Sequence, residues 1–163
     1  MARPGRVEVS SRLEAPADAV WERVITPEGI NEELMPLMRM TLPPEVRSLD
    51  ADTVPIGERI CRSWVLLFGF LPFDYDDIVL VSIDPGRGFH ERSTMLSMRS
   101  WEHERRIEPD GEAACTLHDR LTFVPRLPLP LSPVVRATFG HRHKRLRRRF
   151  GGRPMRLNHP YEG

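Results

Sequence analysis

Three side chains that could take part in acid–base chemistry fall on two neighbouring strand-like segments near residue 110. His103 and Arg105 lie in the first segment, and Asp119 lies in the second. Leu117, Asp119 and Leu121 lie two residues apart in the second segment. Because successive side chains of a strand point to opposite faces, these three point to the same inward face. A carboxylate buried among apolar side chains needs a partner. We therefore expect the three groups to cluster, either as an ion pair without chemistry or as the polar end of a binding site.

The turn between these two segments decides which residues face each other. Residues 109–111, Pro-Asp-Gly, have the composition and order of a three-residue hairpin loop. That loop places Trp101 opposite Asp119 and leaves His103 diagonal to Asp119, whereas a shift of the loop by one residue places His103 directly opposite. His103 and Asp119 are neighbours in both registers. A nearby carboxylate would raise the pKa of the histidine and burial would lower it, so both directions stay open.

Two other groups have residue types that bind metals. Asp74, Asp76 and Asp77 stand at the start of a strand-like segment beside a loop, where carboxylates are commonly solvated, and no histidine stands at ligand spacing. His141 and His143 are two residues apart in a helical segment, so they point about 200° away from each other. We expect solvated carboxylates, no metal site and no cofactor.

The segment 132–150 predicts a long C-terminal helix. A serine followed by a proline is a start signal, because the hydroxyl can accept a free backbone N–H and proline suits the first helical turn. The apolar stripe of this helix consists of Val135, Phe139, Leu146 and Phe150. Such a helix must lie on an apolar surface, and the space between them is a candidate pocket.

The same helix is strongly basic. Residues 136–156 contain nine basic side chains and no acidic one, whereas acidic residues outnumber basic ones in the preceding part. A basic run can bind nucleic-acid phosphates. However, no aromatic residues alternate with the arginines to stack on bases, and the acidic remainder would repel phosphate. We expect a solvated helix face and no nucleic-acid partner; a protein-interaction surface on this helix is an alternative function.

The remaining segments predict an antiparallel sheet and two short helices. A strand over residues 7–13 precedes one helix that starts near Pro16 and a second that starts at Thr26-Pro27. Further strands are predicted at residues 37–42, 59–68, 73–84, 89–98, 101–108 and 113–124. The proline-rich residues 125–133 cannot form a regular ladder, so they are expected to cross over to the final helix.

Length and composition fit one domain. With 163 residues, 40% hydrophobic and 29% charged, we expect a single domain over residues 1–150 and a flexible tail over residues 151–163. No apolar run approaches the roughly 20 residues that cross a bilayer, so no membrane insertion is expected. The N-terminus lacks the apolar segment of a signal peptide, which favours the cytoplasm.

Residues 14–36, EAPADAVWERVITPEGINEELMP, resemble the opening of the START/Bet v 1-like (SRPBCC, polyketide cyclase/dehydrase-type) superfamily. Pro16 follows the first strand, Trp21 marks the first helix, and Thr26-Pro27 starts the second. The stretches WEHERRIEP and HRHKRL are similar to those of bacterial members of unassigned role. The resemblance implies an α+β helix-grip fold, with a curved antiparallel β-sheet wrapped around a long C-terminal helix and two short helices after the first strand.

The candidate pocket between sheet and helix is the expected binding site, and the resemblance suggests what it could bind. The superfamily includes lipid-transfer modules, plant binders of hydrophobic ligands and polyketide cyclases/aromatases, and it shares no catalytic motif, so no catalytic residue is assigned. We expect a binder of a hydrophobic small molecule, lipid-like or polyketide-like; the alternative is an enzyme of the cyclase/aromatase type. The expected ligand-binding residues are Trp101, His103, Arg105, Leu117, Asp119, Leu121, Phe123 and Phe139. We expect five methionines either to line the cavity or to fill the core: Met35, Met38, Met40, Met95 and Met98.

Overall fold

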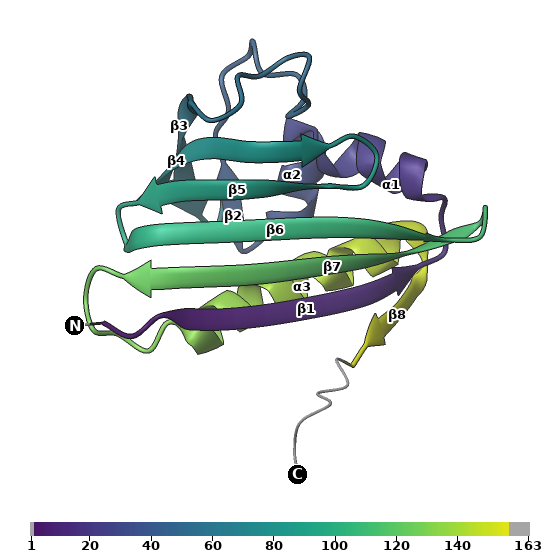
Figure 1. The fold of residues 1–163 in the computed structure, drawn as a ribbon. Coiled ribbons are helices and arrows are strands. Elements are labelled where there is room, and N and C mark those ends of the chain that lie inside the picture. The colour runs from purple at the N-terminus through teal and green to yellow at the C-terminus, as the bar shows by residue number, and fades with distance from the viewer. Residues whose placement is uncertain (1, 157–163) are drawn as a thin grey trace.

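The computed structural model describes residues 2–156 and shows one sheet with three helices (Figure 1). The elements in chain order are β1 (Gly5–Leu13), α1 (Ala17–Val24), α2 (Pro27–Leu34), β2 (Met38–Met40), β3 (Arg59–Leu67), β4 (Leu71–Asp84), β5 (Gly88–Met95), β6 (Met98–Asp110), β7 (Ala114–Pro125), α3 (Ser132–Phe150) and β8 (Gly152–Met155). No helix within these described residues is long and apolar enough to cross a membrane.

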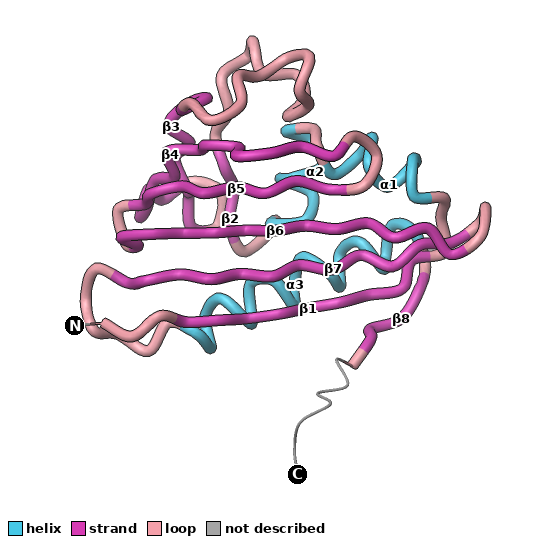
Figure 2. The backbone as a smooth tube through the Cα atoms, viewed as in Figure 1, coloured by secondary structure: helices cyan, strands magenta, loops and turns pink. Residues whose placement is uncertain are grey.

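The eight strands form one antiparallel sheet in the order β2-β3-β4-β5-β6-β7-β1-β8. α3 runs along one face of the sheet, behind β7 and β1 in Figure 1, and Figure 2 shows that α1 and α2 follow the first strand as two short helices. This is the helix-grip fold, a curved antiparallel sheet around a long C-terminal helix, as the resemblance implies.

α3 has the bounds that the sequence predicts, and its apolar stripe faces the sheet. Val135, Phe139 and Leu146 are buried, and Phe150 is half-buried. The sequence misses two polar members of this face, since Arg142 and His143 are also buried. α3 therefore brings charge as well as apolar area to the core.

The start of α3 differs from the prediction in one detail. Ser132 is the first helical residue, Leu131 precedes it in the capping position, and no side chain caps this end. A cap must lie outside the helical conformation to direct its oxygen at the first free N–H groups, and Ser132 lies one position too late. α2 does have such a cap, because the Thr26 hydroxyl accepts the Gly29 N–H at 3.0 Å.

The turn between β6 and β7 consists of residues 111–113, whereas the sequence predicts residues 109–111. β6 is consequently longer than expected, and Arg105 lies opposite Asp119, a position predicted for Trp101. The shift preserves the alternation of both strands. The side chains predicted to point inward therefore still do so.

Pro109 does not end β6 because its nitrogen faces an open side. The Ile107 N–H donates to the Arg87 carbonyl beside β5 at 2.7 Å, and Pro109, two residues further on, presents its nitrogen on the same side. The paired part of β5 ends at Gly88, opposite Arg106, so no strand lies there to accept a hydrogen bond. The proline therefore removes no ladder bond, and the strand continues.

The chain does not become a tail directly after α3. Residues 152–155 form β8, which pairs with β1 from Ser10 to Leu13. Gly151 ends the helix at φ +75°, and at Gly152 a β-carbon would lie 1.9 Å from the Arg12 carbonyl oxygen. The expected flexible tail is therefore wrong for these residues, because the two glycines allow the close return of the chain. Residues 157–163 lie outside the described residues.

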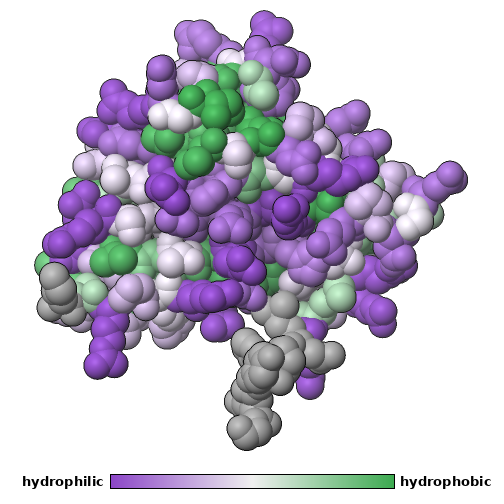
Figure 3. All heavy atoms as spheres, viewed as in Figure 1, coloured by the Kyte–Doolittle hydropathy of each residue, from purple (hydrophilic) through white to green (hydrophobic). Residues whose placement is uncertain are grey.

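The outer face of the sheet is polar, and the core lies on the helix side. Figure 3 shows mostly hydrophilic side chains on this face, with an apolar patch around β4 and the loop before β3. Inside, one apolar cluster packs α1 and Leu146 on the sheet, a second packs Val135 and Phe139 on β7, and a third joins α2 to β4. The second and third clusters border the cavity described next.

Candidate ligand-binding cavity

A cavity of about 440 Å³ lies between the sheet, α2 and α3. Its wall is made mainly of apolar side chains from the strands β2 to β6, together with Leu34 of α2, Phe139 of α3 and the loop after β7. Small-molecule sites in proteins typically have volumes of about 300–1,000 Å³ and walls of this composition. The cavity is therefore large enough to hold an apolar organic molecule.

Methionines contribute an adaptable part of this wall. Four of the five predicted methionines line the cavity: Met38, Met40, Met95 and Met98. Met35 does not, and its backbone carbonyl instead contacts Nε2 of His141 at 2.9 Å. Flexible thioether side chains fill irregular spaces, so this wall can adjust to ligands of different outline.

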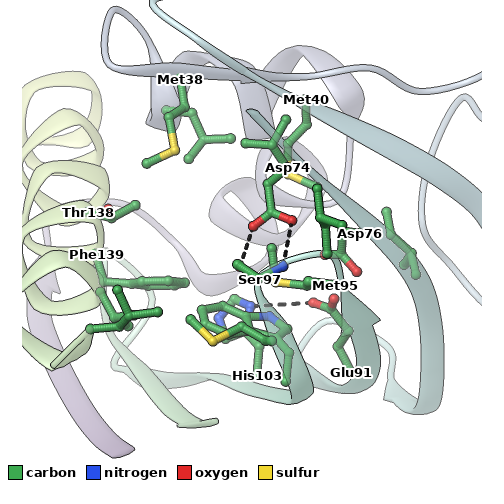
Figure 4. Close-up of a pocket in the computed structure, with 18 of the residues that line it drawn as sticks. Met38, Met40, Asp74, Asp76, Glu91, Met95, Ser97, His103, Thr138 and Phe139 are labelled. Carbon is green, nitrogen blue, oxygen red and sulfur yellow. Dashed lines mark hydrogen bonds and ion pairs between the residues drawn. The ribbon is translucent and has the colours of Figure 1, made fainter. Parts of the chain in front are cut away.

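Three carboxyl side chains form a polar end of the cavity: Asp74 and Asp76 of β4, and Glu91 of β5 (Figure 4). They are 4%, 4% and 8% exposed, so the expectation that Asp74 and Asp76 are solvated is wrong. β4 begins earlier than predicted, and its alternation places both aspartates on the inward face with Ile78 and Leu80. The same alternation could have revealed them in the sequence.

Asp74 is well supplied with donors. The backbone N–H groups of Tyr75 and Ser97 donate to its Oδ1 at 2.8 and 3.1 Å, and the Ser97 hydroxyl donates to Oδ2. Figure 4 shows both contacts with Ser97. These bonds fix the carboxyl group against the loop between β5 and β6, so Asp74 ties that loop to β4.

Asp76 and Glu91 are neighbours with opposite pKa shifts. Burial and the adjacent Glu91 charge raise the pKa of Asp76 well above its ordinary value. Burial alone would raise the pKa of Glu91 too, but hydrogen bonds from His103, Ser93 and Asp76 lower it. The Ser93 hydroxyl donates to Glu91 Oε1 at 2.7 Å. Of the two carboxyl groups, Asp76 therefore holds a proton more readily than Glu91 does.

His103 connects this polar end to the interior of the protein. Its Nε2 contacts Asp119 Oδ1 at 2.8 Å, and its Nδ1 lies 3.8 Å from Glu91 Oε2. The ring packs edge-on against Phe89 and Phe139, with centroids 5.2 and 5.0 Å away. The imidazole is thus held between two carboxyl groups in the cavity wall, a geometry in which it can take or give a proton.

Behind His103 lies a buried ion cluster. Arg105 donates to both oxygens of Asp119 at 2.8 and 2.7 Å and to both oxygens of Glu33 at 3.0 and 2.8 Å. Nε of Arg142 donates to Glu33 at 3.1 Å. Burial alone would raise the pKa values of Asp119 and Glu33, but the guanidinium groups outweigh it and lower both. Two carboxylates and two guanidinium groups therefore balance in charge.

His143 completes the cluster from α3. Nε2 contacts Asp119 Oδ2 at 2.9 Å, and Nδ1 contacts the Ser11 hydroxyl at 2.9 Å. Sequence reasoning missed both His143 and Glu33. Glu33 left a signal, because it falls between Ile30 and Leu34 on the apolar face of α2, where a carboxylate needs a cationic partner.

The structure divides the eight predicted ligand-binding residues into two groups. Those that line the cavity are Trp101, His103 and Phe139. Those that are buried but do not line it are Arg105, Leu117, Asp119, Leu121 and Phe123. His103, Arg105 and Asp119 do cluster, although only His103 of the three reaches the cavity wall. The others support the wall from behind.

The basic face of α3 is only partly solvated. Nε of Arg145 donates to the Glu32 backbone carbonyl at 2.9 Å, and Arg149 donates to the Glu32 carboxylate at 2.9 Å. Burial raises the pKa of Glu32, but hydrogen bonds from Arg23 and Arg149 lower it overall. Several arginines therefore join α3 to α2 and are not free for a partner.

A possible metal-ligand group lies on the outer face, where the sequence predicted none. Ligand atoms of His90, Glu102 and Glu104 lie within 4.8 Å of one another. However, Arg92 Nε contacts Glu102 at 3.1 Å and Arg120 lies 3.7 Å from Glu104, so arginines already compensate both carboxylates. His141 and His143 point apart, to the Met35 carbonyl and to Asp119.

Solved structures with the same fold are diverse. CV1439 from Chromobacterium violaceum is 14% identical, with a TM-score of 0.70 over 90% of this chain and 97% of that one. A START superfamily protein from Mycobacterium smegmatis is 16% identical, with a TM-score of 0.64 over 89% and 96%. Zhui aromatase/cyclase from Streptomyces sp. R1128 is 17% identical, with a TM-score of 0.55 over 88% of each chain. No curated protein matches the sequence.

The fold is that of START/Bet v 1-like proteins, and at these identities the likeness shows the fold alone. Residues 11–150 match the family described as "Domain of unknown function (DUF8410)". The match covers most of the chain, so the protein belongs to this family.

Proposed function

We propose that the protein binds a hydrophobic small molecule in the cavity between the sheet and α3. The observation that carries this proposal is the 440 Å³ space with a mainly apolar wall and a few polar groups gathered at one end. Apolar surface binds a ligand by removing it from water, and the polar groups orient it.

A neutral fluorescent probe, N-phenyl-1-naphthylamine, tests this proposal. Wild-type protein should bind about one equivalent with increased probe fluorescence. Thr138 of α3 lines the cavity, whereas the adjacent Ala137 is exposed. Thr138→Trp should fill the space and abolish binding, and Ala137→Trp should leave it unchanged. Equal binding by both variants would mean that the probe sits elsewhere, and no binding by wild type would contradict the proposal.

An enzyme of the polyketide cyclase/aromatase type is a second candidate. It is favoured by one observation, the His103 imidazole in the cavity wall between Glu91 and Asp119. Such an imidazole can move protons during an aldol ring closure. A poly-β-ketone added to the protein should then yield a cyclised product, and His103→Gln should abolish that product. Identical product profiles with and without protein would exclude this activity.

A further inference from the structure

One buried oxygen at the polar end of the cavity has no hydrogen-bond partner. Asp76 lines the cavity and is 4% exposed, yet its Oδ1 has no partner among residues 2–156. Buried polar atoms in proteins are almost always paired, because an unpaired one loses its bonds to water without replacement. An unpaired oxygen in a cavity wall therefore indicates where a ligand places a polar group.

The neighbouring carboxyl groups do not share this property. Both oxygens of Asp74 accept hydrogen bonds from residues of its own loop region. Glu91 is bonded to Ser93 and lies beside His103. On the adjacent strand β3, Ser63 lies directly opposite Asp76, and its hydroxyl is also buried and unpaired among the described residues. The unmet demand for hydrogen bonds is thus centred on Asp76.

The free oxygen of Asp76 is an acceptor. An ionised carboxyl group has two acceptor oxygens, and the protonated form, which burial and Glu91 favour by raising the pKa of Asp76, keeps one acceptor oxygen. Either form of the carboxyl group therefore offers an acceptor oxygen to the cavity. A ligand group that pairs with this oxygen must be a hydrogen-bond donor.

The charges of the cavity wall disfavour a charged ligand group at this end. An anionic ligand group at this end would face the Glu91 and Asp74 carboxyl groups. The basic side chains of the wall lie elsewhere: Arg142 is paired with Glu33, and Arg126 donates to the Met95 carbonyl at the exposed rim. A cationic ligand group would lose its hydration in the apolar cavity. Glu91, which could compensate that loss, already has His103 beside it. A neutral donor meets neither obstacle.

We infer that the ligand is an apolar molecule with a neutral hydroxyl group, and that this hydroxyl donates a hydrogen bond to Oδ1 of Asp76. The inference rests on the proposed binding function and specifies the chemical class of the ligand. It excludes free fatty acids and phosphorylated lipids, whose polar ends are anionic.

Four probes with the same ring system test it by calorimetric titration at neutral pH: naphthalene, 2-naphthol, 2-naphthoate and protonated 2-naphthylmethylamine. Wild-type protein should bind 2-naphthol about tenfold more tightly than naphthalene, because one hydrogen bond to an otherwise unpaired buried oxygen is gained. The two charged probes should bind more weakly than 2-naphthol.

Two matched variants locate the effect. Asp76→Leu removes the acceptor but keeps a side chain of similar size, so the preference for 2-naphthol over naphthalene should disappear while naphthalene still binds. Asp77 occupies the next position of β4 on the outer face, where it binds Arg62. Asp77→Leu should therefore keep the wild-type preference. If Asp76→Leu does not fold, carbon-13 NMR of wild-type aspartate carboxyl groups should show a shift of the Asp76 signal with 2-naphthol and not with naphthalene.

The outcomes separate this inference from the proposed function. Equal affinities for naphthalene and 2-naphthol, or an unchanged preference in Asp76→Leu, would overturn the hydroxyl site and leave hydrophobic binding intact. Tightest binding of 2-naphthoate that is lost in Arg126→Gln would place the polar end at the rim, and tightest binding of the amine would make the site cationic. Failure of all four probes to bind would refute the binding function itself.

Discussion

Arg105 and Asp119 lie directly opposite each other on β6 and β7, and the guanidinium donates to both oxygens of the carboxylate at 2.8 and 2.7 Å. The second side of the guanidinium binds Glu33 of α2. This one side chain thus joins the sheet to a helix from the other half of the chain. The cavity wall at His103 is positioned by that connection.

Removal of the Asp119 charge should be strongly destabilising. Asp119→Asn leaves Arg105 with a single carboxylate partner and weakens the hydrogen bonds of two histidines, and the loss of one member of a buried ion pair typically costs about 3–5 kcal/mol. Urea unfolding measures the loss. Asp77→Asn breaks an exposed ion pair and serves as the control, because such pairs contribute little. Similar losses in both variants would mean that the cluster is not a structural element.

Acid should weaken the same cluster. The folded-state pKa of Asp119 is lowered, so Asp119 stabilises the fold above the pKa of an unfolded aspartate, and this contribution is lost as the pH falls through the lowered value. Wild-type stability should therefore decrease steeply below about pH 4, the ordinary aspartate value. Asp119→Asn lacks this contribution and should show a shallower decrease. Parallel acid limbs would argue against a lowered pKa at Asp119.

Asp76 should have the opposite pH dependence. Its folded-state pKa is raised, so its stabilising contribution is complete below the pKa of an unfolded aspartate and is lost as the pH rises through the raised value. Asp76→Asn cannot ionise. Its free energy of unfolding should therefore improve relative to wild type between pH 4 and pH 8, as measured by urea unfolding at both values. A constant difference would show that Asp76 is ionised throughout.

Phe139 should be required for stability. Its ring is 2% exposed and packs against Trp101 and His103, with centroids 6.1 and 5.0 Å away. Phe139→Ala should lower the free energy of unfolding by about 3–5 kcal/mol. Arg136, one turn earlier on α3, is exposed, and Arg136→Ala should have little effect on the same free energy of unfolding. If both variants lost the same amount of stability, Phe139 would not lie on the face of α3 that packs on the core.

The basic helix should not bind nucleic acid at physiological salt. Arg142, Arg145 and Arg149 are engaged with α2, which leaves fewer guanidinium groups for phosphate. A protein that makes 6–10 phosphate contacts binds about 10³–10⁵ times more tightly when salt falls from 200 to 50 mM. A fluorescence titration with a labelled duplex should lack that slope. Micromolar binding at 150 mM salt with that slope would contradict this prediction.

Local sequence signals predicted most of the helices and strands, and the family resemblance implied how they are arranged. Proline start signals, the apolar stripe of α3 and the alternation in β7 depend on residues close together in the chain, and each matched the structure closely. The alternation also determined which side of β6 and β7 faces the helix. The position of the turn was not predicted correctly, because a proline usually ends a strand. Pro109 can stay within β6 only because β5 ends before it, and the length of β5 was not known from the sequence.

The candidate site was predicted less completely because its residues come from distant segments. The contact between His103 and Asp119 was predictable from one hairpin. Glu33 and His143 reach the same cluster from α2 and α3, and no local pattern pairs them with β6 or β7. The burial of Asp76 was visible in the alternation of β4, but its raised pKa depends on Glu91 in another strand.

The short strand β8 protects part of one edge of the sheet. It occupies the free edge of β1 from Ser10 to Leu13, and a chain shortened at residue 150 would leave all nine residues of β1 without a partner on that side. Long open edges recruit strands from other molecules. Trimming the chain at residue 150 would therefore expose a β1 edge that can pair with strands of other molecules.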